Sequence, residues 1–155
     1  MIKIYPDYLD SNTIDDFVSK VDYSKSQPWP NSDIPNLHSV CSIRHPSNKV
    51  VQQLGELGNV ELLTYTAGSY SSPHIDDYSW SADFKWVATG ILFASNPIEY
   101  EGGEFMLNNF NMILKPPKGT LIVFPAGPNS KQYVHSVKLI EEGIRKVIVY
   151  RFISR

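Results

Sequence analysis

The chain has 155 residues, which predicts a single domain with one sizeable core, since a domain takes roughly 100 to 200 residues. Its 14 Lys and Arg residues against 16 Asp and Glu residues give a formal charge of −2. A protein that binds nucleic acid by neutralising phosphates needs a basic surplus or a basic run. Because the chain has neither, we expect no nucleic-acid partner.

The cellular setting is predicted from what the sequence does not contain. Cys41 is the single cysteine, so no internal disulfide can form, and the start at Met1 lacks the apolar stretch of a secretory signal. No apolar run approaches the roughly 20 residues that cross a bilayer. We therefore expect a cytoplasmic protein with no membrane partner.

Helical periodicity is confined to the first third of the chain. One short amphipathic helix is predicted after Ser11 or Asn12 as the cap, and a second between Ser47 and Gly58. Their apolar residues recur at positions i, i+3, i+4 and i+7: Ile14, Phe17, Val18 and Val21 in the first helix, and Val50, Val51, Leu54 and Leu57 in the second.

The proline-rich segment Ser24–Pro46 is predicted to be irregular, with one short strand at Val40–Ile43. From Val60 onward the period changes to that of strands: Val60–Thr66, Ser69–Ile75, Lys85–Ala94, Gly103–Leu107, Met112–Leu114, Thr120–Phe124, His135–Ile140 and Ile144–Ile153.

Eight short strands with no room for crossover helices predict a mainly β, mostly antiparallel jelly roll, that is, a double-stranded β-helix. The N-terminal helices should pack outside one of its sheets. We expect one domain over residues 1–155, in which residues 1–58 form a helical support and residues 59–155 form the jelly-roll core.

A candidate metal site follows from residue type and strand parity. His74 and Asp76 stand two residues apart near a strand end, so their side chains share one face. Alone, such a pair is more often a surface turn. His135 begins a much later strand that a jelly roll can bring alongside, and two histidines with one carboxylate are the ligands of non-haem Fe(II) oxygenases. Zinc is the alternative metal.

Arg145 begins the last predicted strand. A guanidinium inside a barrel is costly unless it binds a carboxylate, for which its two parallel N–H groups are suited. This indicates an acidic small-molecule cosubstrate, whereas an exposed strand residue beside Lys146 is the plain alternative. Strand alternation places Val147, Val149 and Arg151 on the same face as Arg145.

From about Val60 to its C-terminus the sequence resembles the Fe(II)- and 2-oxoglutarate-dependent oxygenases, in particular their prolyl 4-hydroxylase-like branch. Order, spacing and residue types agree over six segments: His74–Asp76, Thr89–Phe93, Gly102–Phe105, Gly119–Pro125, His135–Val137 and Gly143–Arg145.

The resemblance implies that His74, Asp76 and His135 hold Fe(II) and that Arg145 binds the distal carboxylate of 2-oxoglutarate, with O2 as the cosubstrate. It also implies a cosubstrate contact for Tyr65, for which a buried core tyrosine is the alternative.

Two positions depart from the family pattern. Phe93 stands where related hydroxylases often carry a tyrosine that helps the arginine, and Phe93 has no hydroxyl to donate; Thr120 could supply that bond instead. Arg151 stands where a bulky aromatic is usual. We expect Arg151 at the pocket mouth, in contact with substrate, and a salt bridge at a strand end is an equal alternative.

The predicted function is hydroxylation of a C–H bond, with a prolyl residue in a peptide or protein as the first substrate and a small molecule as another. Trp80 and Trp86, around Asp83, are expected to form a substrate-binding loop. Two other classes stay open: a cupin-type metal enzyme that does not use 2-oxoglutarate, and a non-catalytic jelly-roll binding protein.

Overall fold

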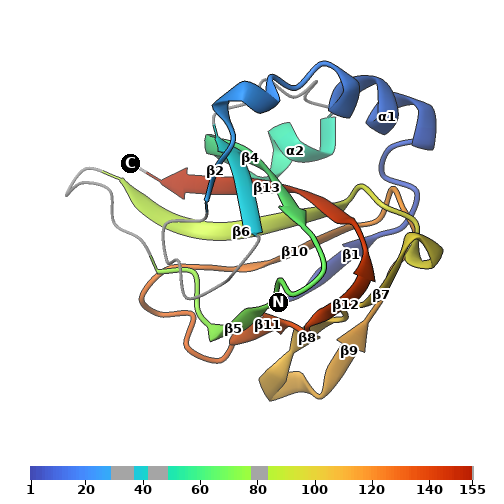
Figure 1. Ribbon diagram of the computed structural model, residues 1–155. Helices are drawn as coiled ribbons and strands as arrows, with labels where there is room; N and C mark the ends of the chain where they lie inside the picture. The colour runs from blue at the N-terminus through green and yellow to red at the C-terminus, as the bar shows by residue number, and fades with distance from the viewer. Residues whose placement is uncertain (29–36, 42–48, 78–83, 155) are drawn as a thin grey trace.

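Two antiparallel sheets face each other in the structure, a computed structural model that describes residues 1–28, 37–41, 49–77 and 84–154 (Figure 1). The larger sheet has the strand order β1-β10-β6-β13-β4-β3-β2. Its strands are β1 (Lys3–Tyr5), β2 (Gln27–Pro28), β3 (Leu37–Cys41), β4 (Glu56–Tyr65), β6 (Lys85–Phe93), β10 (Leu121–Pro125) and β13 (Arg145–Ser154).

The smaller sheet has the order β5-β11-β8-β9, and a two-stranded ribbon pairs β12 with β7. Every pairing between described strands is antiparallel. The strands are β5 (Ser71–His74), β7 (Tyr100–Gly102), β8 (Phe105–Leu107), β9 (Met112–Leu114), β11 (His135–Val137) and β12 (Ile140–Gly143). The predicted mainly β jelly-roll class is confirmed.

Strand alternation divides the apolar residues between two layers. On β13, Val147 and Val149 pack into the cluster between the sheets, which also holds Phe105 from the smaller sheet. Ile148 and Tyr150 point the other way, into a second cluster on the outer face of the larger sheet. The face predicted for Val147 and Val149 is therefore confirmed, and the inner face of β13 carries both of its arginines.

The two α-helices, α1 (Ser11–Ser19) and α2 (Lys49–Leu54), lie over the outer face of the larger sheet in Figure 1. Ile14 of α1 and Val51 of α2 are fully buried in the outer cluster. Single turns of 3-10 helix occur at Tyr23–Lys25, Pro97–Glu99 and Asn108–Phe110. No helix within the described residues has the length and apolar character that spanning a membrane requires.

Helix ends differ from the prediction at both helices. Asp10, rather than Ser11 or Asn12, caps α1, because its carboxylate accepts the Thr13 N–H at 2.8 Å. The second helix ends at Leu54, and Glu56 already begins β4. The predicted boundary at Gly58 is wrong. Leu57 fits the apolar spacing of the helix, but it belongs to strand β4 and packs against the outer cluster from there.

The N-terminal third contributes more than helices. β1 pairs with β10 at one edge of the larger sheet, and β3 pairs with β4 towards the other. The expected strand at Val40–Ile43 is observed as β3, earlier and within Leu37–Cys41. β1 and β3 therefore extend the sheet that α1 and α2 cover, and of these two strands the sequence indicated only β3.

Candidate metal centre and anion pocket

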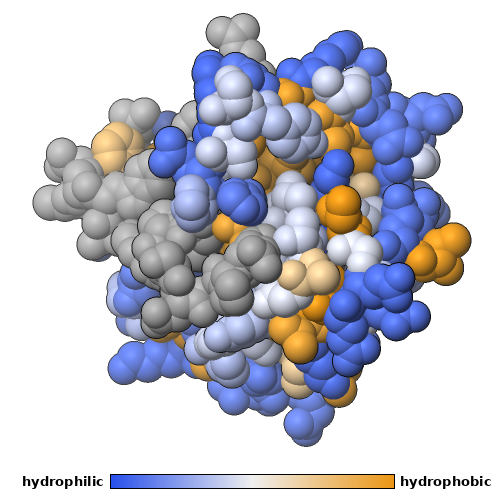
Figure 2. Space-filling model, viewed as in Figure 1, coloured by the Kyte–Doolittle hydropathy of each residue, from blue (hydrophilic) through white to orange (hydrophobic). Residues whose placement is uncertain are grey.

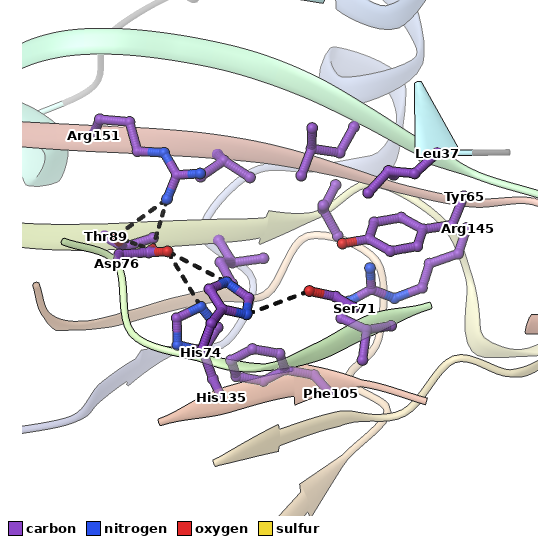
Figure 3. Close-up of a pocket in the computed structure, with 15 residues that line it drawn as sticks. Leu37, Tyr65, Ser71, His74, Asp76, Thr89, Phe105, His135, Arg145 and Arg151 are labelled. Carbon is purple, nitrogen blue, oxygen red and sulfur yellow. Dashed lines mark hydrogen bonds and ion pairs between the residues drawn. The ribbon is translucent and has the colours of Figure 1, made fainter. Parts of the chain in front are cut away.

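A pocket opens between the two sheets and has a volume of about 480 Å³, counting its part open to solvent (Figure 3). Three potential metal ligands lie at one end, and a buried arginine lies at the other. Apolar side chains from both sheets line the space between these two ends: Leu37, Leu63, Ile91, Phe105, Val137, Val147 and Val149.

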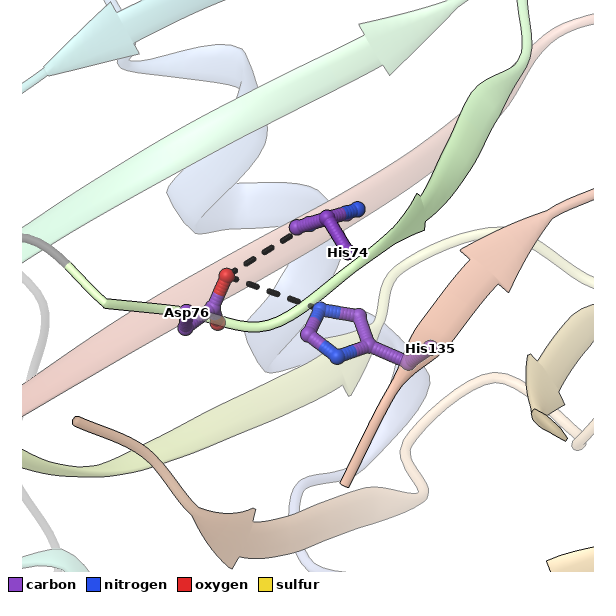
Figure 4. Close-up of side chains that lie close together, drawn as sticks. All are labelled: His74, Asp76 and His135. Carbon is purple, nitrogen blue, oxygen red and sulfur yellow. Dashed lines mark ion pairs between the residues drawn. The ribbon is translucent and has the colours of Figure 1, made fainter. Parts of the chain in front are cut away.

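The first end of the pocket is formed by His74, Asp76 and His135 (Figure 4). His74 ends β5, His135 begins β11, and the two are direct partners across the strand pairing. Asp76 follows β5 two residues on. One ligand atom from each side chain lies within 4.8 Å of the others, a group that could hold a metal ion and the only such group of His, Cys, Asp and Glu among the described residues.

Hydrogen bonds fix which nitrogen each imidazole presents. His74 Nδ1 lies 2.7 Å from the Ser72 carbonyl, and His135 Nδ1 lies 3.0 Å from the Tyr133 carbonyl. A carbonyl oxygen only accepts, so each Nδ1 carries the proton and each Nε2 presents a lone pair. Both Nε2 atoms stand 3.5 Å from Asp76 Oδ1. This is how histidine ligands of metals are oriented in proteins.

The Asp76 carboxylate is buried and strongly bound by donors. Its Oδ2 accepts the Thr89 hydroxyl at 2.6 Å and Arg151 Nη1 at 2.7 Å. Burial opposes its ionisation, but the adjacent Arg151 guanidinium and the two histidines hold the pKa of Asp76 well below its usual range. Asp76 is therefore ionised and offers Oδ1 to the two imidazoles.

The pKa of His74 shifts upward, opposite to that of Asp76. Its partial burial disfavours the charged form, yet the hydrogen bond with Asp76, the bond with the Ser72 carbonyl and the charge of Asp76 together outweigh burial and raise the pKa of His74. A carboxylate that stabilises a nearby proton also stabilises a cation placed at the same point. The centre is thus electrostatically prepared for a positive ion.

Arg145 occupies the other end of the pocket and is only 1% exposed. Its guanidinium carbon lies 4.8 Å from the ring centre of Tyr65 and 5.4 Å from that of Phe93. Among the described residues, its Nε and Nη1 atoms have no hydrogen-bond partner. A buried cation with unpaired donors is costly, so this end of the pocket is built for an anion.

No family model matches the sequence, and no curated protein matches it. The structure is similar to the viral collagen prolyl hydroxylase of Paramecium bursaria Chlorella virus-1 in its 2-oxoglutarate complex, with a TM-score of 0.71 and 18% identity over 99% of this chain and 96% of that one. The chain has the fold of the prolyl hydroxylase-like 2-oxoglutarate/Fe(II) oxygenases.

Two further structures share this oxygenase fold. A prolyl-4-hydroxylase from Pseudomonas putida has a TM-score of 0.71 and 15% identity, with 99% of this chain and 92% of that chain covered. HygX from Streptomyces hygroscopicus, solved with nickel, 2-oxoglutarate and hygromycin B bound, has a TM-score of 0.68 and 10% identity, with coverage of 97% and 81%. Structures of this fold thus include both a collagen prolyl hydroxylase and a protein with hygromycin B bound.

The predicted cosubstrate residues do not all reach the pocket of this oxygenase fold. Arg145 and Tyr65 line it and are direct partners on β13 and β4. Thr120 is buried just before β10 but is not among the lining residues, and its carbonyl accepts the Phe93 N–H at 2.9 Å. The cosubstrate contact expected of Thr120 stays a prediction without a position in the pocket.

Three residues were predicted to contact substrate: Arg151, Trp86 and Trp80. Arg151 lines the pocket but is 6% exposed and bonded to Glu61 and Asp76. The Trp86 ring lies against the Arg151 guanidinium, 4.4 Å from its carbon. Trp80 lies outside the described residues. Arg151 thus makes salt bridges, as in the alternative interpretation, but inside the pocket and not at a fraying strand end. Its contact with substrate stays a prediction.

Three functional neighbours were not predicted: Glu61, Thr89 and Tyr100. Glu61 stands four residues before Tyr65 on β4 and therefore shares its inward face, which was a usable signal for a buried acid in need of a cation. Tyr100 is 3% exposed and its hydroxyl hydrogen-bonds with the Arg145 side chain. Nothing local in the sequence connects Tyr100 with Arg145, which is 45 positions away.

Proposed function

We propose that the protein is an Fe(II)- and 2-oxoglutarate-dependent oxygenase that hydroxylates a C–H bond. The observation that carries the proposal is the presence of two complementary features in one pocket. A His-Asp-His group suited to a divalent metal stands at one end. At the other stands the guanidinium of Arg145, whose Nε and Nη1 atoms have no partner among the described residues. A dicarboxylate that reaches both ends satisfies both features.

The metal fits its three ligands in charge and in donor type. Two neutral imidazole nitrogens and one carboxylate oxygen are the donor set of non-haem Fe(II) oxygenases, which leaves further coordination positions for other molecules. The ligands come from elements that other contacts already fix, since β5 and β11 pair directly at His74 and His135. Zinc accepts the same ligands, so the occupant also depends on metal availability.

2-Oxoglutarate fits the arginine end of the pocket. The distal carboxylate would bind Arg145 Nη1 in the apolar surroundings of Tyr65 and Phe93, where a charge-assisted hydrogen bond is strong because water is excluded. Tyr100 orients the guanidinium through its hydroxyl.

When bound, Fe(II) and 2-oxoglutarate would supply the oxidising chemistry, in which O2 is consumed, the keto acid loses CO2 to become succinate and one oxygen atom enters the substrate C–H bond. The chain's own residues position the reactants. His74 and His135 hold their Nε2 atoms towards one point, and Asp76 adds its negative charge there. The apolar wall around Phe105 and Val149 keeps water away from that point.

The proposed substrate is a prolyl residue in a peptide or protein, in keeping with the branch that the sequence resembles. A small molecule is the second candidate, because HygX shares the fold and is a structure with hygromycin B bound. We further propose that the protein works in the cytoplasm.

The proposal is tested by titrating Fe(II)-loaded protein with 2-oxoglutarate in the absence of O2 and recording the visible charge-transfer band of the complex. The band is expected in the wild type and should be lost in His135→Ala and Arg145→Ala. A folded, iron-loaded wild type without the band would contradict the proposal. A metal-dependent activity that survives Arg145→Ala would instead favour the cupin-type enzyme, and absence of metal binding would favour the non-catalytic jelly roll.

A further inference from the structure

A buried chain of ionic contacts runs from Glu61 through Arg151 to Asp76. Figure 3 shows its second half, the contact between Arg151 and Asp76. Arg151 Nε and Nη2 donate to one oxygen of Glu61, at 3.0 and 2.8 Å. Arg151 Nη1 donates to Asp76 Oδ2 at 2.7 Å. All three side chains are less than a tenth exposed, so solvent competes little for these bonds.

The guanidinium has very little freedom to move. Glu61 on β4 holds one edge of its plane, Asp76 binds the opposite nitrogen, and the Trp86 ring covers a face at 4.4 Å. β13, which carries Arg151, pairs with both β4 and β6, and its partner on β6 is Thr89. The position of the Arg151 nitrogen atoms is therefore set by the central strands of the larger sheet.

The two oxygens of Asp76 are used in different ways. Oδ2 accepts two donors, the Thr89 hydroxyl and Arg151 Nη1. Oδ1 faces the Nε2 atoms of His74 and His135 at 3.5 Å each. An oxygen with two short hydrogen bonds has little capacity left for a metal, so the carboxylate is prepared to bind through one oxygen.

We propose that Arg151, fixed by Glu61, is a positioning residue that holds Asp76 Oδ2 and so makes Asp76 a metal ligand through Oδ1 alone. The inference rests on the metal centre of the proposed function and extends it to residues that do not touch the metal. It gives the charged residue at position 151 a role in the metal centre in place of a substrate contact.

Glu61 has a distinct part in this arrangement. Arg151 alone would neutralise Asp76 and weaken its attraction for a divalent cation. Glu61 returns the local balance to one net negative charge over the three side chains while it fixes the arginine. A lysine cannot replace Arg151 here, because a single ammonium does not present two edges in one plane.

The experiment is a titration of metal-free protein with Co(II), read by the visible absorption of the bound ion, which responds to its coordination number. Partners that orient metal ligands typically contribute about 10- to 100-fold in metal affinity. We expect Arg151→Gln to weaken Co(II) binding within that range and to change the spectrum at saturation. Arg151→Lys should restore little of either.

The matched control is Arg145→Gln, which replaces another buried arginine on the inner face of the same strand that no described contact joins to Asp76. Its Co(II) affinity and spectrum should equal those of the wild type. Circular dichroism establishes that each variant is folded. If Arg151→Gln does not fold, Thr89→Val removes the other donor to Oδ2 with little change in shape and should weaken Co(II) binding about tenfold.

The positioning role would be overturned if folded Arg151→Gln bound Co(II) with wild-type affinity and an unchanged spectrum. The same holds for Thr89→Val if that variant is used instead, and the proposed function would stay intact in either case. A wild type that does not bind Co(II), or binds it independently of His74 and His135, would overturn the metal centre and the positioning role together.

Discussion

His74 and His135 face each other as direct strand partners, with ring centres 4.3 Å apart, although they differ sharply in burial. The His74 side chain is 43% exposed and the His135 side chain is 6% exposed. The His135 ring also packs 4.7 Å from that of Phe124 and 5.9 Å from that of Phe105. One ligand thus belongs to the pocket mouth and the other to the core.

This asymmetry predicts different effects of two substitutions that should be alike in metal binding. His74→Ala and His135→Ala each remove one ligand and should both abolish tight Co(II) binding. Only His135→Ala leaves a cavity in the core, and it should cost roughly 2–4 kcal/mol in the free energy of unfolding. His74→Ala should stay within about 0.5 kcal/mol of the wild type. Urea denaturation of the metal-free proteins measures both values, and equal destabilisation would contradict the burial difference.

A second prediction concerns stability at alkaline pH. Burial raises the pKa of Tyr8 to about 12, above its ordinary value of 10.0, and burial also raises the pKa of Tyr150. Above pH 10 the unfolded chain loses protons that the folded chain keeps. The stability that these tyrosines contribute is therefore complete below pH 10 and is lost as pH rises towards 12.

Tyr8→Phe should remove the Tyr8 part of this loss. Between pH 7 and pH 11 the unfolding free energy of Tyr8→Phe should therefore fall by roughly 1 kcal/mol less than that of the wild type. Urea denaturation at both values of pH measures it, and the pH 7 difference is the internal control. Parallel pH profiles would show that the Tyr8 hydroxyl is not protected in the folded state.

A third prediction concerns the backbone just before Arg145. Gly143 has a φ of +85°, and a Cβ added there would lie 2.1 Å from the Glu99 carbonyl oxygen and 2.8 Å from the Tyr100 Cα. Gly143→Ala combines backbone strain with a clash against immobile backbone, and strain alone costs about 1–3 kcal/mol. It should also displace Tyr100 from Arg145 and weaken 2-oxoglutarate binding.

The control for this change is Glu142→Ala, one residue earlier and exposed. It should alter the unfolding free energy by no more than about 0.5 kcal/mol. If Gly143→Ala changed the unfolding free energy as little as Glu142→Ala, β12 would not approach the Glu99–Tyr100 backbone as closely as the structure shows.

How far the sequence predicts this site depends on whether the signal is local. Strand period is local, so alternation by itself predicts the inward face that Arg145, Val147 and Val149 share. The short strand β1 gave no such signal, because its partner β10 lies more than a hundred residues away. The cap of α1 was missed because Asp10, Ser11 and Asn12 all carry an acceptor oxygen.

The partner of Arg151 shows a different limit. Parity predicts an inward arginine, and the same rule applied to Tyr65 predicts an inward Glu61. The pairing of Glu61 with Arg151 could therefore have been predicted from the alternation of two strands. That Arg151 also reaches Asp76 depends on how the segment after β5 passes over β6, which no local pattern specifies.

The last prediction separates the residues that surround Arg145. Arg145→Gln removes the charge that would bind 2-oxoglutarate. A hydrogen bond to a charged group is worth about 1.5–3 kcal/mol, so loss of the bond from Arg145 Nη1 should weaken binding by about 10- to 150-fold. Tyr100→Phe removes only a hydroxyl that orients the guanidinium, and at roughly 0.5–1.5 kcal/mol it should weaken binding about 2- to 10-fold.

Phe93→Tyr should have the opposite effect, because it adds a hydroxyl to a ring whose centre lies 5.4 Å from the Arg145 guanidinium carbon, at a position where the family often has a tyrosine. Binding of 2-oxoglutarate should tighten by about 2- to 10-fold, provided that urea denaturation shows the buried ring to be tolerated. The Fe(II) charge-transfer band measures all three variants, and Co(II) affinity should be equal in each. A stable Phe93→Tyr protein that binds 2-oxoglutarate no more tightly would mean that Tyr100 already supplies what Phe93 lacks.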